Sequence, residues 1–205
     1  IGNVRIGPGH VGRGFVLDGS GGGAILRTPI GLALQDFTIE AWIRRARPAL
    51  VNAGGGEAMI FSFGAGSYGF GLNNSGAPFL AKVGIDKVSS KGELTGTNFH
   101  HVAVSKSGPT VIFAIDGVAD EAKQYDASFD YGRSAAIGCL PDKMETAAFH
   151  GVIDEVSVYN RALTVAELRS IYEAGGAGKC QSSAAPIITG QPRDRMAIAN
   201  GNATF

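Results

Sequence analysis

Two adjacent carboxylates, Asp154 and Glu155, stand within the otherwise apolar run GVIDEVSVY. A buried charge is costly unless a hydrogen-bond donor, a cation or a metal ion compensates it. In a regular strand the two side chains would point to opposite faces, so they would need separate partners. The RRAR run at 44–47 and Arg161 offer cations. Two interpretations stay open for Asp154: hydrogen bonds to backbone or an ion pair with arginine, and coordination of a metal ion.

Calcium is the metal ion that the surrounding sequence would suit. It binds six to eight oxygen atoms from carboxylates, carbonyl groups and water. The Gly-rich turn Asp18–Gly21 follows a predicted strand. Because glycine has no Cβ, such a turn allows carbonyl groups to come close to an ion.

The other titratable residues argue against catalysis. Glycoside hydrolysis needs two carboxyl groups that face each other about 5–9 Å apart. The pairs Asp120–Glu121 and Asp154–Glu155 are adjacent in sequence, so their side chains diverge in a strand. His100 and His101 are also adjacent, and we expect one in the core and the other at the surface. With neither a zinc-type Cys/His spacing nor a G-x-S-x-G motif, the chain is predicted not to be an enzyme.

Three tyrosines are candidate ligand-binding residues. Tyr68, Tyr125 and Tyr131 lie in or near predicted loops. An exposed aromatic ring offers a flat apolar face on which a sugar ring can stack. The alternative is that these side chains belong to the core beneath the loops, since large aromatic residues are more often buried than exposed.

Short alternating segments separated by Gly, Asn and Asp make up most of the chain. In DFTIEAWIRR (36–45), apolar residues at 37, 39, 41 and 43 alternate with Thr, Glu, Trp and Arg, which predicts a half-buried strand. Turns at Ser107–Pro109 and Asp116–Gly117 predict hairpins. Ten or more such strands without interleaved helices predict an all-β, antiparallel sandwich of two sheets.

A single helix is predicted after the last strand, in LTVAELRSIYEAGG. Thr164 and Glu167 have the spacing of a capping box, and Leu163 with Leu168 would form a hydrophobic staple around it. Gly175 is the expected C-terminal stop. The apolar stripe of this short amphipathic helix would consist of Val165, Leu168, Ile171 and Tyr172.

Composition excludes some partners. The 205 residues include 18 basic and 18 acidic residues, so the chain lacks the net positive charge that is typical of nucleic-acid binding. No apolar run approaches the ~20 residues that cross a bilayer, so we expect no membrane insertion.

The two cysteines and the C-terminal segment bear on location and organisation. Cys139 and Cys180 predict an extracellular disulfide, or else two unrelated buried thiols. Residues 176–186 have linker composition, and 187–205 read as two incomplete strands that are too short to bury a core. We expect one domain over 1–175, a linker, and the truncated start of a following domain. The chain would thus be part of a longer, multidomain protein.

The segments FVLDG, DFTIEAWIR, FHHVAVSKSG with VIFAIDG, AAIG and FHGVIDEVSVYNRALTVAELRSIYEAG occur in this order between about Val11 and Gly175. Together they resemble the laminin-G-like, concanavalin-A-like jelly-roll domains of secreted bacterial proteins. The resemblance implies a jelly-roll sandwich. Residues from Ile187 resemble the first strands of immunoglobulin-like domains over a short length.

The resemblance also implies a site and a function. Family members often hold one structural calcium ion between an early loop and the last strand, which matches Asp18, Ser20 and Asp154 here. The expected function is a non-catalytic binding module of an extracellular or cell-surface protein, with a glycan or an extracellular protein as ligand. A spacer domain without a ligand is the alternative, and a glycoside-active enzyme is a more remote one.

Overall fold

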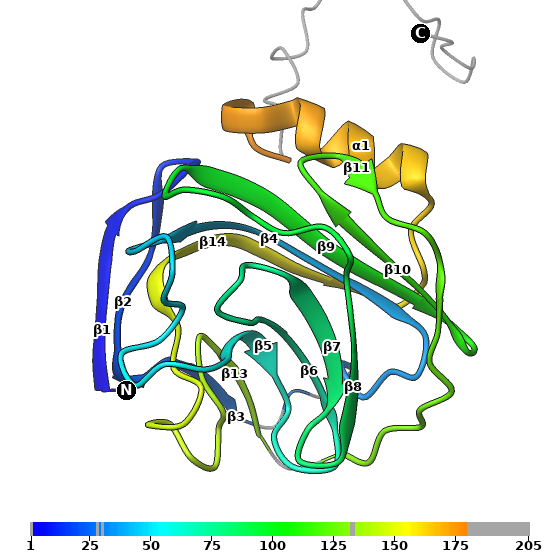
Figure 1. Ribbon diagram of the computed structural model, residues 1–205, viewed down its shortest axis with the longest axis horizontal. Coiled ribbons are helices and arrows are strands. Elements are labelled where there is room, and N and C mark those ends of the chain that lie inside the picture. Colours follow the sequence, from blue (N-terminus) through cyan, green and yellow to red (C-terminus); the bar gives the residue numbers. More distant parts are fainter. Residues whose placement is uncertain (1, 28, 30, 132–133, 180–205) are drawn as a thin grey trace, which may run out of the picture.

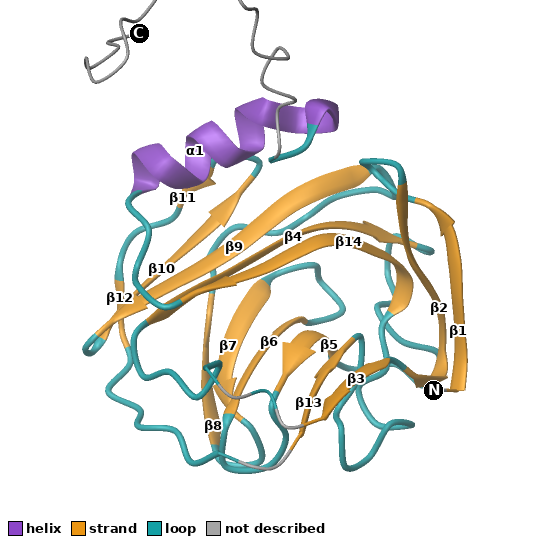
Figure 2. Ribbon diagram, turned by 180° about the vertical axis from the view of Figure 1, so that it is seen from behind, coloured by secondary structure: helices purple, strands orange, loops and turns teal. Residues whose placement is uncertain are grey.

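The computed structural model describes residues 2–27, 29, 31–131 and 134–179. In these residues two antiparallel sheets stack face to face, and one short helix lies outside them (Figure 1). The predicted all-β jelly-roll sandwich with a C-terminal helix is therefore confirmed. The same arrangement is seen from behind in Figure 2, where strands dominate and the helix stands apart at one side.

The larger sheet, called the large sheet below, has its strands in the order β1-β2-β14-β4-β9-β10-β11, with β12 also paired to β10. These strands are β1 (Gly2–Pro8), β2 (Arg13–Gly22), β4 (Phe37–Arg45), β9 (Phe99–Ser107), β10 (Thr110–Ile115), β11 (Val118–Ala119), β12 (Lys123–Gln124) and β14 (His150–Tyr159). Both predicted hairpins are present, since β9 and β10 flank Gly108–Pro109, and β10 and β11 flank Asp116–Gly117.

The second sheet, called the small sheet below, has the order β3-β13-β5-β6-β7-β8. Its strands are β3 (Ala24–Arg27), β5 (Ala58–Ser62), β6 (Tyr68–Leu72), β7 (Pro78–Lys82), β8 (Asp86–Ser89) and β13 (Ser134–Ile137). Non-consecutive neighbours such as β13 and β5 show that the chain crosses between the sheets, as a jelly roll requires.

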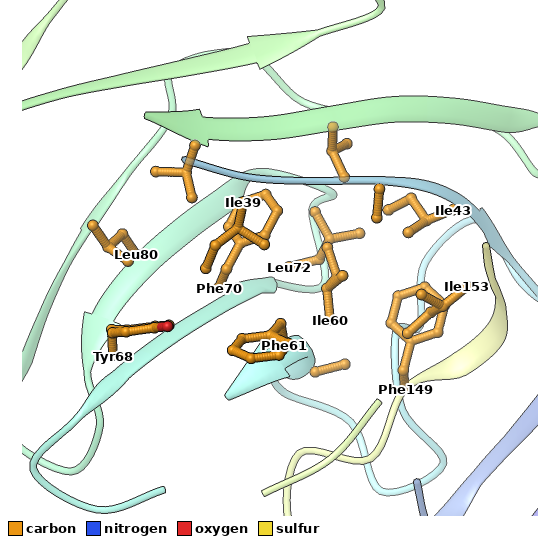
Figure 3. Close-up of a cluster of buried hydrophobic side chains, with 14 of the residues drawn as sticks. Ile39, Ile43, Ile60, Phe61, Tyr68, Phe70, Leu72, Leu80, Phe149 and Ile153 are labelled. Carbon is orange, nitrogen blue, oxygen red and sulfur yellow. The ribbon is translucent and has the colours of Figure 1, made fainter. Parts of the chain in front are cut away.

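The core lies between the two sheets (Figure 3). Inward residues of β4, including Ile39 and Ile43, pack against Tyr68, Phe70 and Leu72 of β6. A bulge in β5 lies between Met59 and Phe61, so two consecutive residues, Ile60 and Phe61, both belong to the core. The period of two in β4 thus predicted the core face correctly.

The second face of β4 is also buried, which corrects the prediction of a half-buried strand. Thr38 and Glu40 are fully buried, and Trp42 is only 6% exposed. They lie on the outer face of the large sheet, and the Trp42 ring stacks on Tyr172 of the helix and on His10. Alternation in the sequence predicts which face of a strand is polar, but not whether that face is exposed. Here a further layer of structure covers the polar face of β4.

That layer is α1 (Val165–Ala174), followed by the 3-10 turn η1 (Gly175–Ala177). The predicted capping box of Thr164 and Glu167 is present, and Gly175 caps the C-terminal end with φ 51°. Leu163 and Leu168 are buried against Ala103 and Ala114 of the large sheet. Val165 does not belong to the buried stripe, because it is 43% exposed at the first turn.

Residues 180–205 lie outside the described residues, so the linker beyond Lys179, Cys180 and the predicted immunoglobulin-like start are not placed. Within the part of the chain that is described, no helix has both the length and the apolarity to cross a membrane.

Candidate functional site

Asp154, the carboxylate that raised the metal question, is held by backbone. Its Oδ2 accepts a hydrogen bond from Val11 N at 2.8 Å, and its Oδ1 accepts one from Glu155 N at 2.9 Å. Arg161 pairs with Glu167 instead. The Asp154 carboxylate therefore fastens the β1–β2 turn, which carries His10 onto Trp42.

A β-bulge explains how two adjacent acids fit in a core strand. The register of β14 against β4 shifts between Asp154 and Ser157, and Glu155 adopts a left-handed conformation with φ 51°. The extra residue lets Ser157 lie opposite Glu40 on the outer face, while Val156 packs against the core. Without it, alternation would direct Glu155 into the core, so the expected regular strand is wrong at this point.

Asp18 and Ser20 lie elsewhere on the same sheet. Asp18 Oδ1 accepts hydrogen bonds from Ser20 N at 2.9 Å and from Ser20 Oγ at 2.7 Å, and these bonds lower the pKa of Asp18. Asp18 is exposed and lies opposite His150 in the β2–β14 register. Asn3, Asp18 and His150 are among the residues that line a hollow of about 300 Å³, and Ser20 is not.

The structure does not bring the three predicted calcium ligands together. Asp154 is four residues along β14 from His150, the partner of Asp18, and four strand residues span about 13 Å. Both oxygens of Asp154 already accept backbone hydrogen bonds. Among the described residues, no three His, Cys, Asp or Glu side chains are grouped as a metal site would require. As placed, these residues do not fit one calcium ion, and a melting experiment with calcium and with a chelator tests the expectation from the sequence.

The hydroxyl groups of the three predicted ligand-binding tyrosines all have partners within the domain. Tyr68 is fully buried, and its hydroxyl donates to Leu32 O at 2.6 Å. Tyr125 is buried, and its hydroxyl donates to Asp86 Oδ1 and accepts from Lys82 N. The Tyr131 hydroxyl donates to Leu34 O, and burial raises its pKa to about 12. Tyr68 has no exposed face for a sugar ring, and the alternative of a core role describes it correctly.

Cys139 is fully buried beside Ala136 and Ala148, and burial raises the pKa of its thiol to about 11. Its predicted partner, Cys180, lies outside the described residues, so the disulfide stays a prediction.

The outer face of the large sheet buries a charged cluster that sequence analysis did not identify. Glu40 is fully buried, with His101 Nε2 3.1 Å from Oε2 and Lys179 Nζ 2.7 Å from Oε1. Burial raises the pKa of Glu40, but the His101 hydrogen bond and the Lys179 charge outweigh burial and lower it. His100 is partly exposed and pairs with Asp116, so the expectation of one core and one surface histidine is confirmed.

Beside α1 lies a hollow of about 520 Å³, lined mainly by apolar side chains such as Leu163 and Ile171. Its charged residues already have partners on the domain. Arg161 and Glu167 form an ion pair at the helix cap, and Lys179 pairs with Glu40. The hollow thus shares Lys179 with the buried cluster at Glu40.

The outer face of the small sheet, in contrast, is open. A groove of about 500 Å³ runs over β5 and β7, and its floor consists of the side chains of Met59, Ala81 and Val83. The strand between them, β6, contributes only glycines to this face. A Cβ on Gly69 would lie 2.8 Å from Val83 Cγ2 and 3.0 Å from Met59 Sδ, so neighbouring side chains close over β6.

Polar groups line the edge of this groove. Glu57 and Lys87 form an ion pair whose side chains are 36% and 45% exposed. Lys87 Nζ also lies 5.4 Å from the centroid of the buried Phe79 ring. Asn52 Nδ2 donates to Glu57 O at 2.5 Å and so fixes the loop that carries Glu57. Asp86 completes the charged lining and accepts the Tyr125 hydroxyl.

This groove is the candidate functional site, because it combines an apolar floor with accessible donors and acceptors. Sequence analysis missed it, since Glu57 and Lys87 belong to no motif. A partial signal was present in YGFGL (68–72), where glycines alternate with large apolar residues. That pattern indicates a strand with large side chains on its core face and no side chains on its outer face.

Comparison with known families agrees with the fold. Residues 18–169 match the concanavalin A-like lectin/glucanases superfamily, and the chain belongs to this family. The sequence has no significant match among curated proteins.

Several solved structures share the fold at low sequence identity. Domain 4 of AbnA, a GH43 extracellular arabinanase from Geobacillus stearothermophilus in complex with arabinotriose, has a TM-score of 0.65 and 18% identity over 83% of this chain and 81% of that chain. The CBM40 of the Ruminococcus gnavus IT-sialidase has a TM-score of 0.60 and 14% identity, over 77% and 95%. Trypanosoma rangeli sialidase in complex with sialic acid has a TM-score of 0.63 and 16% identity, over 85% and 29%. The chain thus corresponds to less than a third of that sialidase.

Proposed function

We propose that this domain is a non-catalytic carbohydrate-binding module of a secreted or cell-surface, multidomain protein, and that its ligand occupies the groove on the small sheet. The observation that carries the proposal is the open groove itself, with an aliphatic floor and the exposed Glu57–Lys87 pair beside it. Sugars present both C–H faces and hydroxyl groups, so they match such a surface. The arabinanase domain in complex with arabinotriose supports a glycan as the class of ligand.

The carboxylates in the groove support binding without catalysis. Glu57 pairs with Lys87, and Asp86 accepts the Tyr125 hydroxyl. A glycosidase needs one carboxyl group that donates a proton and a second that acts as nucleophile or base. Incubation of the domain with the polysaccharide it binds should release no reducing sugar, and measured turnover would overturn the non-catalytic assignment.

A glycan array followed by calorimetric titration tests the proposal, and two tryptophan variants locate the site. Thr146 is an exposed residue at the groove, so Thr146→Trp should block it and abolish binding. Ser170 is an exposed hydroxyl residue in the hollow beside α1, so Ser170→Trp should leave binding unchanged. Loss of binding in the Ser170 variant alone would move the site to the helix, and no bound glycan would favour a spacer domain.

A further inference from the structure

We infer that the groove selects neutral sugars over acidic sugars, and that Glu57 and Lys87 bind two neighbouring hydroxyl groups of the ligand. The inference rests on the proposed function, because it concerns the ligand of the same groove.

The Lys87 ammonium group is held in place before a ligand arrives. Its Nζ contacts Glu57 Oε1 and lies over the Phe79 ring. An ammonium group only donates hydrogen bonds and a carboxylate only accepts them. A hydroxyl group does both, so two adjacent sugar hydroxyls can accept from Lys87 and donate to Glu57 without breaking the ion pair.

The balance of charge in the groove disfavours an anionic ligand. The charged residues that line it, within the described part of the chain, are Glu57, Asp86 and Lys87. Carboxylates therefore outnumber the ammonium group. A uronate or sialate carboxylate would have to displace Glu57 from Lys87, which would place like charges side by side. Repulsion of this kind is a common means by which proteins reject the wrong ligand.

The apolar floor of the groove offers no hydrogen bonds, so discrimination between sugars falls to the polar side chains that line it. Met59, Ala81 and Val83 form an aliphatic floor that is only 5%, 6% and 8% exposed, and the 65% exposed Ile85 adds apolar surface at its edge for the C–H groups of a sugar ring. The aromatic ring beneath Lys87, Phe79, is fully buried and so is not available for stacking. Because the floor cannot distinguish one sugar from another by hydrogen bonding, recognition depends on the polar lining, in which Glu57 and Lys87 form the charged pair.

The test compares two sets of immobilised oligosaccharides: neutral pentose and hexose oligomers, and oligomers that contain uronate or sialate. The wild-type domain should bind members of the neutral set, with affinity that changes little between low and high salt. Glu57→Gln removes the competing carboxylate charge. It should weaken binding of the neutral ligand by roughly tenfold, because the sugar hydroxyl then donates to a neutral amide oxygen, which is a weaker acceptor than a carboxylate. The same variant should gain affinity for the acidic set.

Glu121→Gln is the matched control, because Glu121 forms an exposed ion pair with Lys91 outside the groove. It should leave both affinities unchanged, and circular dichroism should confirm that both variants fold. A wild-type domain that prefers the acidic set would overturn this inference and leave the proposed function intact. Equal neutral affinities of wild type and Glu57→Gln would overturn the role of the pair. A domain that binds neither set would overturn the proposed function itself.

Discussion

The outer faces of the two sheets carry their charges in opposite ways. On the large sheet, Glu40 and His101 are fully buried beneath α1 and the β1–β2 turn, and Lys179 closes the cluster. On the small sheet, Glu57 and Lys87 pair in contact with solvent above an aliphatic floor. The same fold thus uses one outer face for stability and leaves the other accessible.

The difference teaches that burial, and not residue type, separates a charge that is enclosed within the fold from one that a ligand can reach. Each face presents a glutamate, a lysine and aromatic residues nearby. Around Glu40 every polar atom of the carboxylate has a partner within the domain, including Tyr159 at 3.3 Å. Around Glu57 the partners leave part of the carboxylate free to meet a ligand.

The most direct test of the difference between the two faces is to remove the glutamate from each of them. Glu40→Ala leaves His101 and Lys179 beside an empty buried site, so it should lower the free energy of unfolding by about 3–5 kcal/mol. Glu57→Ala removes half of an exposed ion pair and should cost less than about 1 kcal/mol. Urea denaturation of the two variants measures both values. Equal losses would contradict the division between a stabilising and an accessible face.

The cover of the large sheet can be weakened through its helix. Leu168 of α1 is almost fully buried between the helix and the large sheet, so Leu168→Ala should lower the free energy of unfolding by about 2–5 kcal/mol. Trp42, the only tryptophan of the chain, lies under the same cover and reports on it. Its emission should shift to longer wavelength if the helix loosens. The exposed Ile85, at the edge of the groove, provides the control: Ile85→Ala should change neither stability nor emission.

Acid should act on the covered face. The pKa of Glu40 lies below its ordinary value of 4.5, so its contribution to stability is complete above about pH 4.5 and is lost as the pH falls through the folded-state pKa. The groups that face it are His101, Lys179 and Tyr159. Unfolding curves of wild type and Glu40→Gln should therefore differ most near neutral pH and converge in acid. A difference that grows below pH 4.5 would contradict this assignment.

Calcium should have the smallest effect. The carboxylates of Asp18 and Asp154 are four register positions apart, and both oxygens of Asp154 accept backbone hydrogen bonds. We therefore expect the same melting temperature in calcium and in a chelator. An ion that binds only the folded state would raise the melting temperature, and such a rise would restore the calcium hypothesis.

Local sequence correctly predicted those strands, turns and the helix whose sequence signals are strong. The alternation in β4, the turns at 107–109 and 116–117, and the capping box of α1 all have residue types that fix the backbone directly. The strand β1 was missed, because its residues GNVRIGP are mostly exposed and contain two glycines. It forms only through pairing with β2, which is a tertiary effect.

The candidate site could not be predicted from local sequence, because it too depends on tertiary structure. Glu57 and Lys87 are 30 residues apart and meet only when β5 and β8 come to lie in one sheet. The bulge at Glu155 has no glycine to mark it, so the strand was expected to alternate regularly. Pairs that depend on sheet order cannot be found from a residue and its neighbours.

The attachment of Lys179 has a practical consequence. Lys179 donates to Ser157 Oγ and pairs with Glu40, so the chain reaches position 179 on the outer side of the large sheet, the side of α1 in Figure 1. The groove is on the outer side of the other sheet. A sensor chip or a resin coupled through an exposed residue of α1, such as position 170, would hold the domain on the outer side of the large sheet and leave the groove on the opposite side accessible to a dissolved polymer.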